Sequence, residues 1–430
     1  MSIEIITNTI FTPSPSSPPH PLLNSPIPLT IFDRAALDLH IPILYAFKPP
    51  MPTNESMKEG LSKALNHFPH LAGRLTVDNH LRHCILLNNA GIRLVETRIS
   101  HTLEEQLPLD LSKDLSMYYQ PINDVDEPLQ VQLNRFSCGG MVIGLSAHHR
   151  VADGHSMGFF LHAWARLVRG LEVHPLPYHD RAAISVPRNP PHYDFDHQTI
   201  EFTEELVTTP SPIANLAVHF SSKFLTQLKK QVMGASPMHP YSTFECLLAH
   251  LWKKITLVRM LDGNQHTQVT VAVNGRARLK PVVPIEYFGN LVLCASPCLT
   301  VDDLLKGSYE VVAKAIHNAV AKMDDAYFRS FIDFGAMSEG KDGDIGMVLV
   351  LPEAANSLCP NLEVDSWLRI MLDDVDFGSG RPCAFLPALL PVEGLLILVS
   401  SCEEEGGVDA YLSLLNDQVN VFKQISHTLD

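Results

Sequence analysis

Residues 141–154 read MVIGLSAHHRVADG, an apolar run that ends in a histidine pair, an acid and a glycine. Upstream, residues 129–133 alternate between apolar and polar side chains, which predicts a half-buried strand. Residues 137–140 hold two glycines and supply a turn, so the apolar run is the second strand of a hairpin. Downstream, apolar residues recur at helical spacing over 157–168, and Gly170 ends the helix. The segment therefore leaves a buried strand and enters a helix, a junction at which rigid scaffolds commonly place reactive side chains.

His149 is the candidate reactive residue at this junction. A histidine followed four residues later by Asp153 and then by a glycine is well placed to take a proton from a substrate. His192 and Asp196 repeat the spacing, but they lie among prolines without an apolar period, which predicts a surface connection. The alternative for His149 is a buried histidine that the backbone satisfies, a role that His148 fits better.

Composition limits the class of protein. A chain of 430 residues with 46% hydrophobic residues is too long for one core, which predicts two domains. The net charge of −15 argues against nucleic acid as a partner and is compatible with a cationic substrate. No apolar run approaches about 18 residues, so no membrane span is expected. The N-terminal segment lacks the basic region of a secretion signal, so we expect a cytoplasmic protein.

The eight cysteines include no Cys-x-x-Cys pair, which favours reduced thiols in a cytosolic protein. Cys294 and Cys298 are close in sequence, but no set of cysteines and histidines beside them has the spacing of zinc ligands. We therefore expect no metal site.

Prolines divide the chain near its middle. Residues 172–202 hold five of them, which predicts a stiff, extended crossover. We place an N-terminal domain at 1–175, the crossover at 176–202 and a C-terminal domain at 203–430. Both halves mix strand and helix patterns, which predicts an α/β fold. The expected elements include strands at 41–47, 269–273 and 395–399, a helix at 57–68 that breaks at Pro69, and a helix over 244–252 capped by Ser242 or Thr243 with Glu245 as in a capping box.

Six motifs point to a known family. They are LAGR at 71–74, HRVADG at 149–154, STFE at 242–245, NGRAR at 274–278, YFGN at 287–290 and DFGSGRP at 376–382. In this order they resemble the plant BAHD acyl-CoA-dependent acyltransferases, and the resemblance covers nearly the whole chain. It implies two domains shaped like chloramphenicol acetyltransferase, with a channel between them that admits acyl-CoA from one face and the acceptor from the other. It also implies that Asp376, Gly378 and Gly380 belong to a structural motif away from the reaction centre.

One residue departs from the family pattern, which has a tryptophan where this chain has Ser379. The packing of that tryptophan is therefore in question here. The amine-acylating branch similar to agmatine coumaroyltransferases also has a small residue at this place. Residues 361–370, NLEVDSWLRI, look like that branch as well.

Acyl transfer from a thioester needs no covalent intermediate, only a base that makes the acceptor nucleophilic as it attacks. His149 can supply this base. Asp153 can orient its ring, but the resemblance implies that this acid turns away and pairs with an arginine, for which Arg276 is the candidate. The charge that develops on the thioester oxygen needs a fixed donor. The resemblance gives this role to Trp367, whose alternative is a packed core aromatic.

Glu363 and Asp365 precede Trp367 at two-residue intervals, which places all three on one face of an extended segment. Two carboxylates there can hold a guanidinium or a distal ammonium group through charge-assisted hydrogen bonds. Shikimate-acylating relatives have an uncharged hydroxyl residue in place of Asp365. The alternative is a solvated strand edge.

The resemblance implies coenzyme A as the carrier of a co-substrate, not as a bound cofactor. The sequence contains no glycine-rich phosphate loop. The candidate contacts are Ser242 and Thr243, at a helix start whose free amides can meet a phosphate, and the basic residues Arg276 and Lys280. Arg276 has the competing role beside Asp153.

These patterns and the resemblance imply a monomeric, cytoplasmic N-acyltransferase without a metal or cofactor. It is expected to move a hydroxycinnamoyl group such as coumaroyl from CoA to agmatine, with putrescine or tyramine as further acceptors. The alternative enzyme is an O-acyltransferase for an alcohol or shikimate-like acceptor. A further alternative is a non-catalytic acyl-CoA-binding relative, against which the intact His149 and Gly154 argue.

Overall fold

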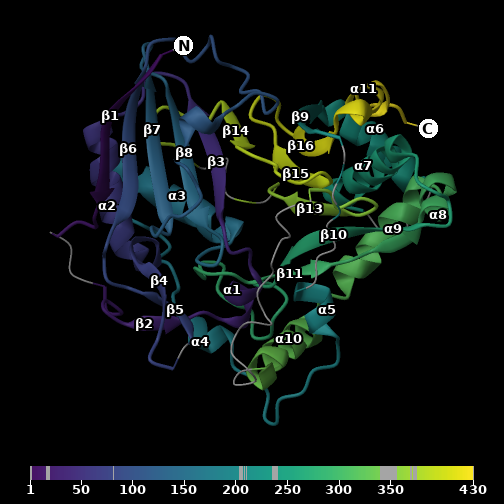
Figure 1. Cartoon of the computed structure of the whole chain (residues 1–430), viewed down its shortest axis with the longest axis horizontal. Helices are drawn as coiled ribbons and strands as arrows, with labels where there is room; N and C mark the ends of the chain where they lie inside the picture. The colour runs from purple at the N-terminus through teal and green to yellow at the C-terminus, as the bar shows by residue number, and fades with distance from the viewer. Residues whose placement is uncertain are drawn as a thin grey trace.

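The computed structural model describes residues 2–15, 20–80, 82–202, 207, 209, 211–234, 241–338, 356–368, 370 and 375–429. Within them the chain forms two large mixed sheets with helices packed on them, together with a small three-stranded sheet (Figure 1). The predicted α/β class with mixed sheets is confirmed. No helix of these residues is long and apolar enough to cross a membrane.

The first sheet has the strand order β1-β6-β7-β8-β3-β14 and lies on the left of Figure 1. Its strands are β1 (Ile3–Phe11), β3 (His40–Phe47), β6 (Ile92–Ile99), β7 (Leu129–Phe136), β8 (Met141–His148) and β14 (Ala384–Pro387). Only β6 and β7 run parallel. The predicted hairpin is β7 and β8, with Leu129 opposite Ala147. Strand β7 is buried on both faces and not half-buried as predicted, because the polar residues Gln130 and Gln132 are enclosed along with the apolar ones.

Two helices share the core of this sheet, α2 (Asn54–His67) and α3 (Gly154–Val168). They pack against each other, and Gly60 permits the close approach because a Cβ there would lie 2.4 Å from Val168. The helix expected at 57–68 is α2, and it ends at the 3-10 turn Pro69–Ala72 as predicted. The helix expected after the hairpin is α3, and it ends before Gly170, which has a φ of 75°.

The second sheet has the strand order β11-β10-β13-β15-β16-β9, and β12 also pairs with β10. Its strands are β9 (Ile213–Phe220), β10 (His266–Asn274), β11 (Val292–Ala295), β12 (Cys298–Thr300), β13 (Leu362–Ser366), β15 (Leu395–Ser400) and β16 (Val408–Leu415). Strand β13 runs parallel to both of its neighbours. The strands expected at 269–273 and 395–399 lie in β10 and β15.

Helix α7 (Thr243–Arg259) is the most buried helix of the second half. Its first turn carries the predicted capping box, in which the Ser242 hydroxyl accepts from the amide of Glu245 and the Glu245 carboxylate accepts from the amide of Ser242. The neighbouring helices are α6 (Ser222–Met233), α8 (Val301–Lys306), α9 (Tyr309–Ala321) and α11 (Asn416–Ile425).

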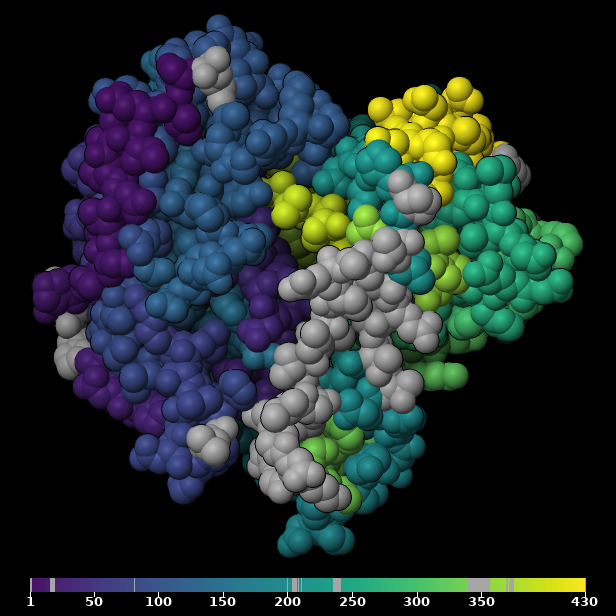
Figure 2. Space-filling model, viewed as in Figure 1, coloured from purple at the N-terminus to yellow at the C-terminus, as the bar shows by residue number. Residues whose placement is uncertain are grey.

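The two halves exchange segments. Strand β14 comes from the C-terminal half, pairs with β3, and buries Phe385 in the first core. In return, the short helix α1 (Ile31–Ala35) places Ile31 and Phe32 in the second core, where it meets α10 (Asp325–Ser338). Figure 2 shows a yellow C-terminal segment between the blue N-terminal residues and the teal and green ones. The predicted limits 1–175 and 203–430 therefore do not follow the sheets strictly.

The segment 176–202 is more structured than the extended connector that its prolines predict. It contains α4 (Arg181–Ile184) and α5 (His197–Phe202), and Arg181 is only 2% exposed. The segment is held in this structure because its polar side chains form ion pairs and hydrogen bonds with buried groups of other elements, as described below. His192 is exposed, in agreement with its prediction as a surface residue.

A small sheet, β2 (Pro26–Pro28), β5 (His83–Leu86) and β4 (Arg74–Val77), completes the N-terminal half. No disulfide joins any of the eight cysteines, all of which lie among the described residues, in agreement with the predicted reduced thiols.

Candidate functional site

His149 lies in the short connection between β8 and α3. Its backbone N–H donates to the carbonyl of Leu39 at 2.9 Å, and its own carbonyl accepts from Nδ2 of Asn290 at 2.8 Å. The side chain is half-buried, and its Nδ1 is enclosed without a hydrogen-bond partner among the described residues. This leaves Nε2 as the ring nitrogen that can reach a substrate.

Asp153 faces away from that ring. It is the N-cap of α3, where its Oδ1 accepts from the amide of Ser156 at 2.8 Å. Both carboxylate oxygens accept from Arg276, at 2.8 and 3.1 Å, and Oδ2 also accepts from the amide of Leu291. Burial by itself would raise the pKa of Asp153, but Arg276 and the Ser156 amide outweigh it and the pKa is lowered. The expected pairing of Asp153 with Arg276 is thus present.

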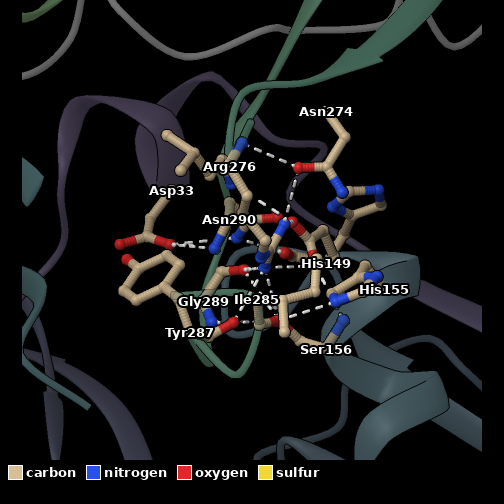
Figure 3. A network of polar contacts seen from close by, with 12 residues as sticks. Asp33, His149, His155, Ser156, Asn274, Arg276, Ile285, Tyr287, Gly289 and Asn290 are labelled. Atoms are coloured by element: carbon tan, nitrogen blue, oxygen red, sulfur yellow. Dashed lines mark hydrogen bonds and ion pairs between the residues drawn. The ribbon is translucent and has the colours of Figure 1, made fainter. Parts of the chain in front are cut away.

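Arg276 is 1% exposed, and both of its Nη atoms donate to buried groups of the protein. Its Nη2 also donates to the Ser156 hydroxyl at 3.0 Å and to the carbonyls of Tyr287 and Gly289 at 2.9 and 3.1 Å (Figure 3). Burial and these partners disfavour a contact between this guanidinium and a CoA phosphate. These contacts support the structural role of Arg276 beside Asp153, and its proposed CoA contact stays a prediction that they disfavour.

Three further polar residues support the same connection, and sequence reasoning missed their role. Asp33, on α1, is fully buried and forms an ion pair with Arg181 at 2.7 Å. Its Oδ1 accepts from the backbone amide and from Nδ2 of Asn290, at 3.2 and 3.0 Å. Arg181 in turn donates to the carbonyl of Val151 at 2.6 Å.

A sequence signal existed for one of these three residues. Thr30 and Asp33 have the spacing of a capping box, and the structure contains that box. Asn290 was noted only as part of a motif. Arg181 carries no local signal, because its partners lie far away in the chain.

Glu363 and Asp365 lie on one face of β13, as predicted. Leu362 and Val364 alternate with them and are buried in the second core. Strand β13 is flanked by β10 and β15, so the alternative of a solvated strand edge is wrong. Burial raises the pKa of the Asp365 carboxyl, and the nearby imidazole of His149 partly offsets this effect. Asp365 is therefore within electrostatic reach of His149.

Trp367 follows the end of β13. Its backbone N–H donates to the carbonyl of Leu398 at 2.8 Å, and its ring lies 5.5 Å from that of Phe385 on β14. The half-buried side chain packs against the first core. The aromatic packing is thus present, and the expected role as oxyanion donor stays a prediction.

The segment 376–382 is a turn that Asp376 organises. Its Oδ1 accepts from the amides of Gly378 and Gly380 at 2.7 and 2.8 Å, and its Oδ2 accepts from Arg169 at 3.1 Å. The two glycines have φ values of 108° and 90°, which glycine adopts without strain. Ser379 occupies the place of the family tryptophan, and its Oγ lies 2.8 Å from Sδ of Met51. These contacts agree with a structural motif that ties the chain before β14 to the end of α3.

The other candidates for CoA contacts are Ser242, Thr243 and Lys280. The amide of Ser242 is not free, because it donates to Glu245 at 2.7 Å, and the Glu245 carboxylate places a negative charge at this helix start. A phosphate there would meet that charge. Lys280 is exposed, and it stays a candidate together with the amide of Thr243. A cavity of about 640 Å³ lies between residues 105–118 and β9, but no predicted site residue lines it.

Comparisons with known proteins give a consistent result. The model of the Transferase family matches residues 1–429. Tryptamine hydroxycinnamoyltransferase 2 of Oryza sativa subsp. japonica is 47% identical over 417 residues, which cover 94% of this chain and 93% of that protein. Agmatine coumaroyltransferase-1 of Hordeum vulgare is 40% identical over 417 residues, with 94% of each chain covered. The crystal structure of vinorine synthase matches with a TM-score of 0.75 at 24% identity, over 97% of this chain and 96% of that one.

Proposed function

Because the chain belongs to the BAHD family of acyl-CoA-dependent acyltransferases, we propose that it transfers a hydroxycinnamoyl group from CoA to a small primary amine. His149 is the base of this reaction, and agmatine is the acceptor that we put first. The proposal rests on one observation above others, the position of Glu363 and Asp365 on one face of β13, with Asp365 within electrostatic reach of His149. Two acids on this face attract a cationic acceptor more strongly than a neutral alcohol, and a bound cation in turn favours the ionised form of Asp365.

The proposed chemistry uses Nε2 of His149 as the base. The amine nitrogen attacks the thioester carbonyl carbon, a C–N bond forms, and the carbonyl oxygen takes the negative charge. Nε2 of His149 removes a proton from the attacking nitrogen. When the tetrahedral adduct collapses, the C–S bond breaks and the sulfur of CoA takes that proton from the imidazolium. The products are an amide and CoA, and the base returns to its first state.

The thioester is already activated, so the proposed reaction requires neither a metal nor a prosthetic group. Trp367 is our candidate for the donor to the oxyanion. The amide of Thr243 and the ammonium of Lys280 are our candidates for CoA. We expect the enzyme to act as a cytoplasmic monomer.

The two acids of β13 suggest how the acceptor is held. Asp365 lies within electrostatic reach of the base and takes the reacting ammonium group, which releases one proton to solvent before it attacks as the neutral amine. Glu363 lies two residues away on the same face, a separation of roughly 6.6 Å along a strand. In agmatine a chain of four methylene groups separates the amine from the guanidinium. We assign the distal guanidinium to Glu363 and the reacting end to Asp365.

A second acceptor class is favoured by the comparisons. The relative that is 47% identical is named for tryptamine, which carries one ammonium group and an aromatic ring. Such an acceptor would need Asp365 but not Glu363. The alternative of an alcohol or shikimate-like acceptor would need neither charge.

The experiment is a panel of acceptors with coumaroyl-CoA. Agmatine, putrescine, tyramine, tryptamine and shikimate are offered separately, CoA release is followed by a thiol reagent, and products are identified by mass spectrometry. The proposal predicts amide products from one or more amines and little ester from shikimate. An ester as the main product, or no transfer to any amine, would contradict it.

A further inference from the structure

Asn290 has a side chain whose orientation is determined by its neighbours. The residue is 2% exposed, and its Nδ2 lies 2.8 Å from the carbonyl oxygen of His149 and 3.0 Å from Oδ1 of Asp33. A carbonyl and a carboxylate can only accept, and a side-chain NH2 group has two donors. Both donors are therefore used, one on each partner (Figure 3). The reverse orientation would bring oxygen against two acceptors.

The connection from His149 to Asp153 is held at several residues, and each of them has a different partner. Leu39 accepts from the amide of His149, Arg181 donates to the carbonyl of Val151, and Arg276 holds Asp153. Among the described residues, the carbonyl of His149 receives a hydrogen bond from Asn290.

This carbonyl matters because, within the part of the chain that the structure describes, the ring of His149 has no hydrogen bond at Nδ1. In many enzymes a carboxylate fixes the imidazole through that nitrogen. Here Asp153 is turned to Arg276 instead. The direction of the ring therefore depends on the position of its backbone and on packing.

Asp33 anchors the asparagine. Its carboxylate accepts from both the backbone and the side-chain nitrogen of Asn290, and Arg181 balances its charge at 2.7 Å. Asp33 belongs to α1 and Arg181 to the segment between the halves, whereas Asn290 precedes β11. The anchor thus couples three distant parts of the chain to one peptide group.

We propose that Asn290 is a positioning residue for His149 and that Asp33 is its anchor. The inference rests on the proposed role of His149 as base. Asn290 acts on the backbone of His149, so its removal lets the imidazole shift without altering the acids of β13. A displacement of about 1 Å at a reacting group can cost about 100-fold in rate.

The test is a double-mutant cycle of Asn290→Ala and His149→Ala. With His149 present, Asn290→Ala is expected to lower kcat about 10–100-fold while KM for coumaroyl-CoA and for the amine changes little. With His149→Ala, the same substitution is expected to have no further effect, because no ring remains to be positioned. An equal loss in both backgrounds, or a kcat within twofold of wild type, would overturn the proposal.

A matched pair of buried acids supplies the control. Asp333 on α10 is also fully buried and accepts from the backbone and side chain of an arginine of the crossover, Arg188, but has no bond to Asn290. Asp33→Asn is expected to lower kcat as Asn290→Ala does, and Asp333→Asn to leave kcat unchanged below its melting temperature. Equal effects of both substitutions on kcat would contradict a positioning role.

Folding is checked by thermal melting, and rates are measured well below each transition. If Asn290→Ala does not fold, Asn290→Ser keeps one donor for the cycle. Failure of both to fold would overturn the proposal in favour of a purely architectural role. Failure of the proposed function can be distinguished from failure of the positioning role. In that case the single variant His149→Ala keeps its activity, or the wild type acylates no amine.

Discussion

Asp153→Asn is the substitution that best tests the division between architecture and catalysis. The two carboxylate oxygens accept four hydrogen bonds, from Ser156, from Leu291 and twice from Arg276. Asparagine has the same shape but turns one of these acceptors into a donor. Wherever its NH2 group points, it meets two N–H donors, and the buried guanidinium of Arg276 loses its counter-charge.

The magnitude follows from burial. Asp153 and Arg276 are 2% and 1% exposed, so water cannot replace the lost partner. Removing one member of a buried ion pair costs about 3–5 kcal/mol. At about 2–4 °C for each kcal/mol in domains of 150–250 residues, the melting temperature should fall on the order of 10 °C.

The assay combines thermal melting with kcat measured well below the transition of the variant. We expect a large loss of stability and a loss of activity that accompanies it. Unchanged stability together with a collapse of kcat would refute the reasoning, since Asp153 would then act on His149 directly.

The same ion pair has a pH signature with a definite sign. The pKa of Asp153 is lowered below its ordinary value of 3.8. The pair therefore stabilises the fold at pH values above the ordinary pKa, and this stabilisation is lost as pH falls through the lowered one. Wild type and Asp153→Asn should thus converge in stability under acid conditions. A difference that stays constant down to low pH would contradict the assignment.

Three further predictions concern the base, the acceptor acids and a buried carboxyl. His149→Ala should fold and lose about two to four decades of turnover, whereas His192→Ala, at the exposed repeat of the spacing, should change no rate; near-normal turnover of the first would refute the base. Glu363→Gln should raise KM for agmatine about tenfold, as expected for a charged hydrogen bond, and leave KM for tryptamine unchanged. Asp365→Asn should raise KM for both amines and leave KM for coumaroyl-CoA unchanged. An equal rise in KM for the donor and the acceptors would contradict the assignment of these acids to the acceptor. Burial raises the pKa of Glu201 to about 7, so the wild-type fold loses stability as pH rises toward neutrality and this carboxyl ionises. Relative to wild type, Glu201→Gln should therefore be more stable at pH 8 but not at pH 5, as measured by urea unfolding at both values.

Much of the site's local structure could be predicted from the sequence. The alternation in 129–133 and the apolar run in 141–148 indicated a hairpin, and the helical spacing after Gly154 indicated α3. The one-face arrangement of Glu363 and Asp365 followed from the period of a strand. These inferences succeeded because hydrogen-bond geometry repeats over a few residues, and the side-chain pattern within one element records which face is buried.

The tertiary structure alone decided what those elements meet. The sequence left Arg276 with two competing roles, and only the structure shows its ion pair with Asp153. The sequence also could not show that β13 lies inside a sheet and not at its edge. Nor could it show that Asp33 holds Asn290 and Arg181 beneath the His149 connection. Each of these facts depends on contacts between elements distant in the chain, more than 100 positions apart for the ion pairs and the Asn290 hydrogen bond, and such contacts leave no periodic trace in the chain. They form because burial forces polar groups to find partners wherever packing brings them.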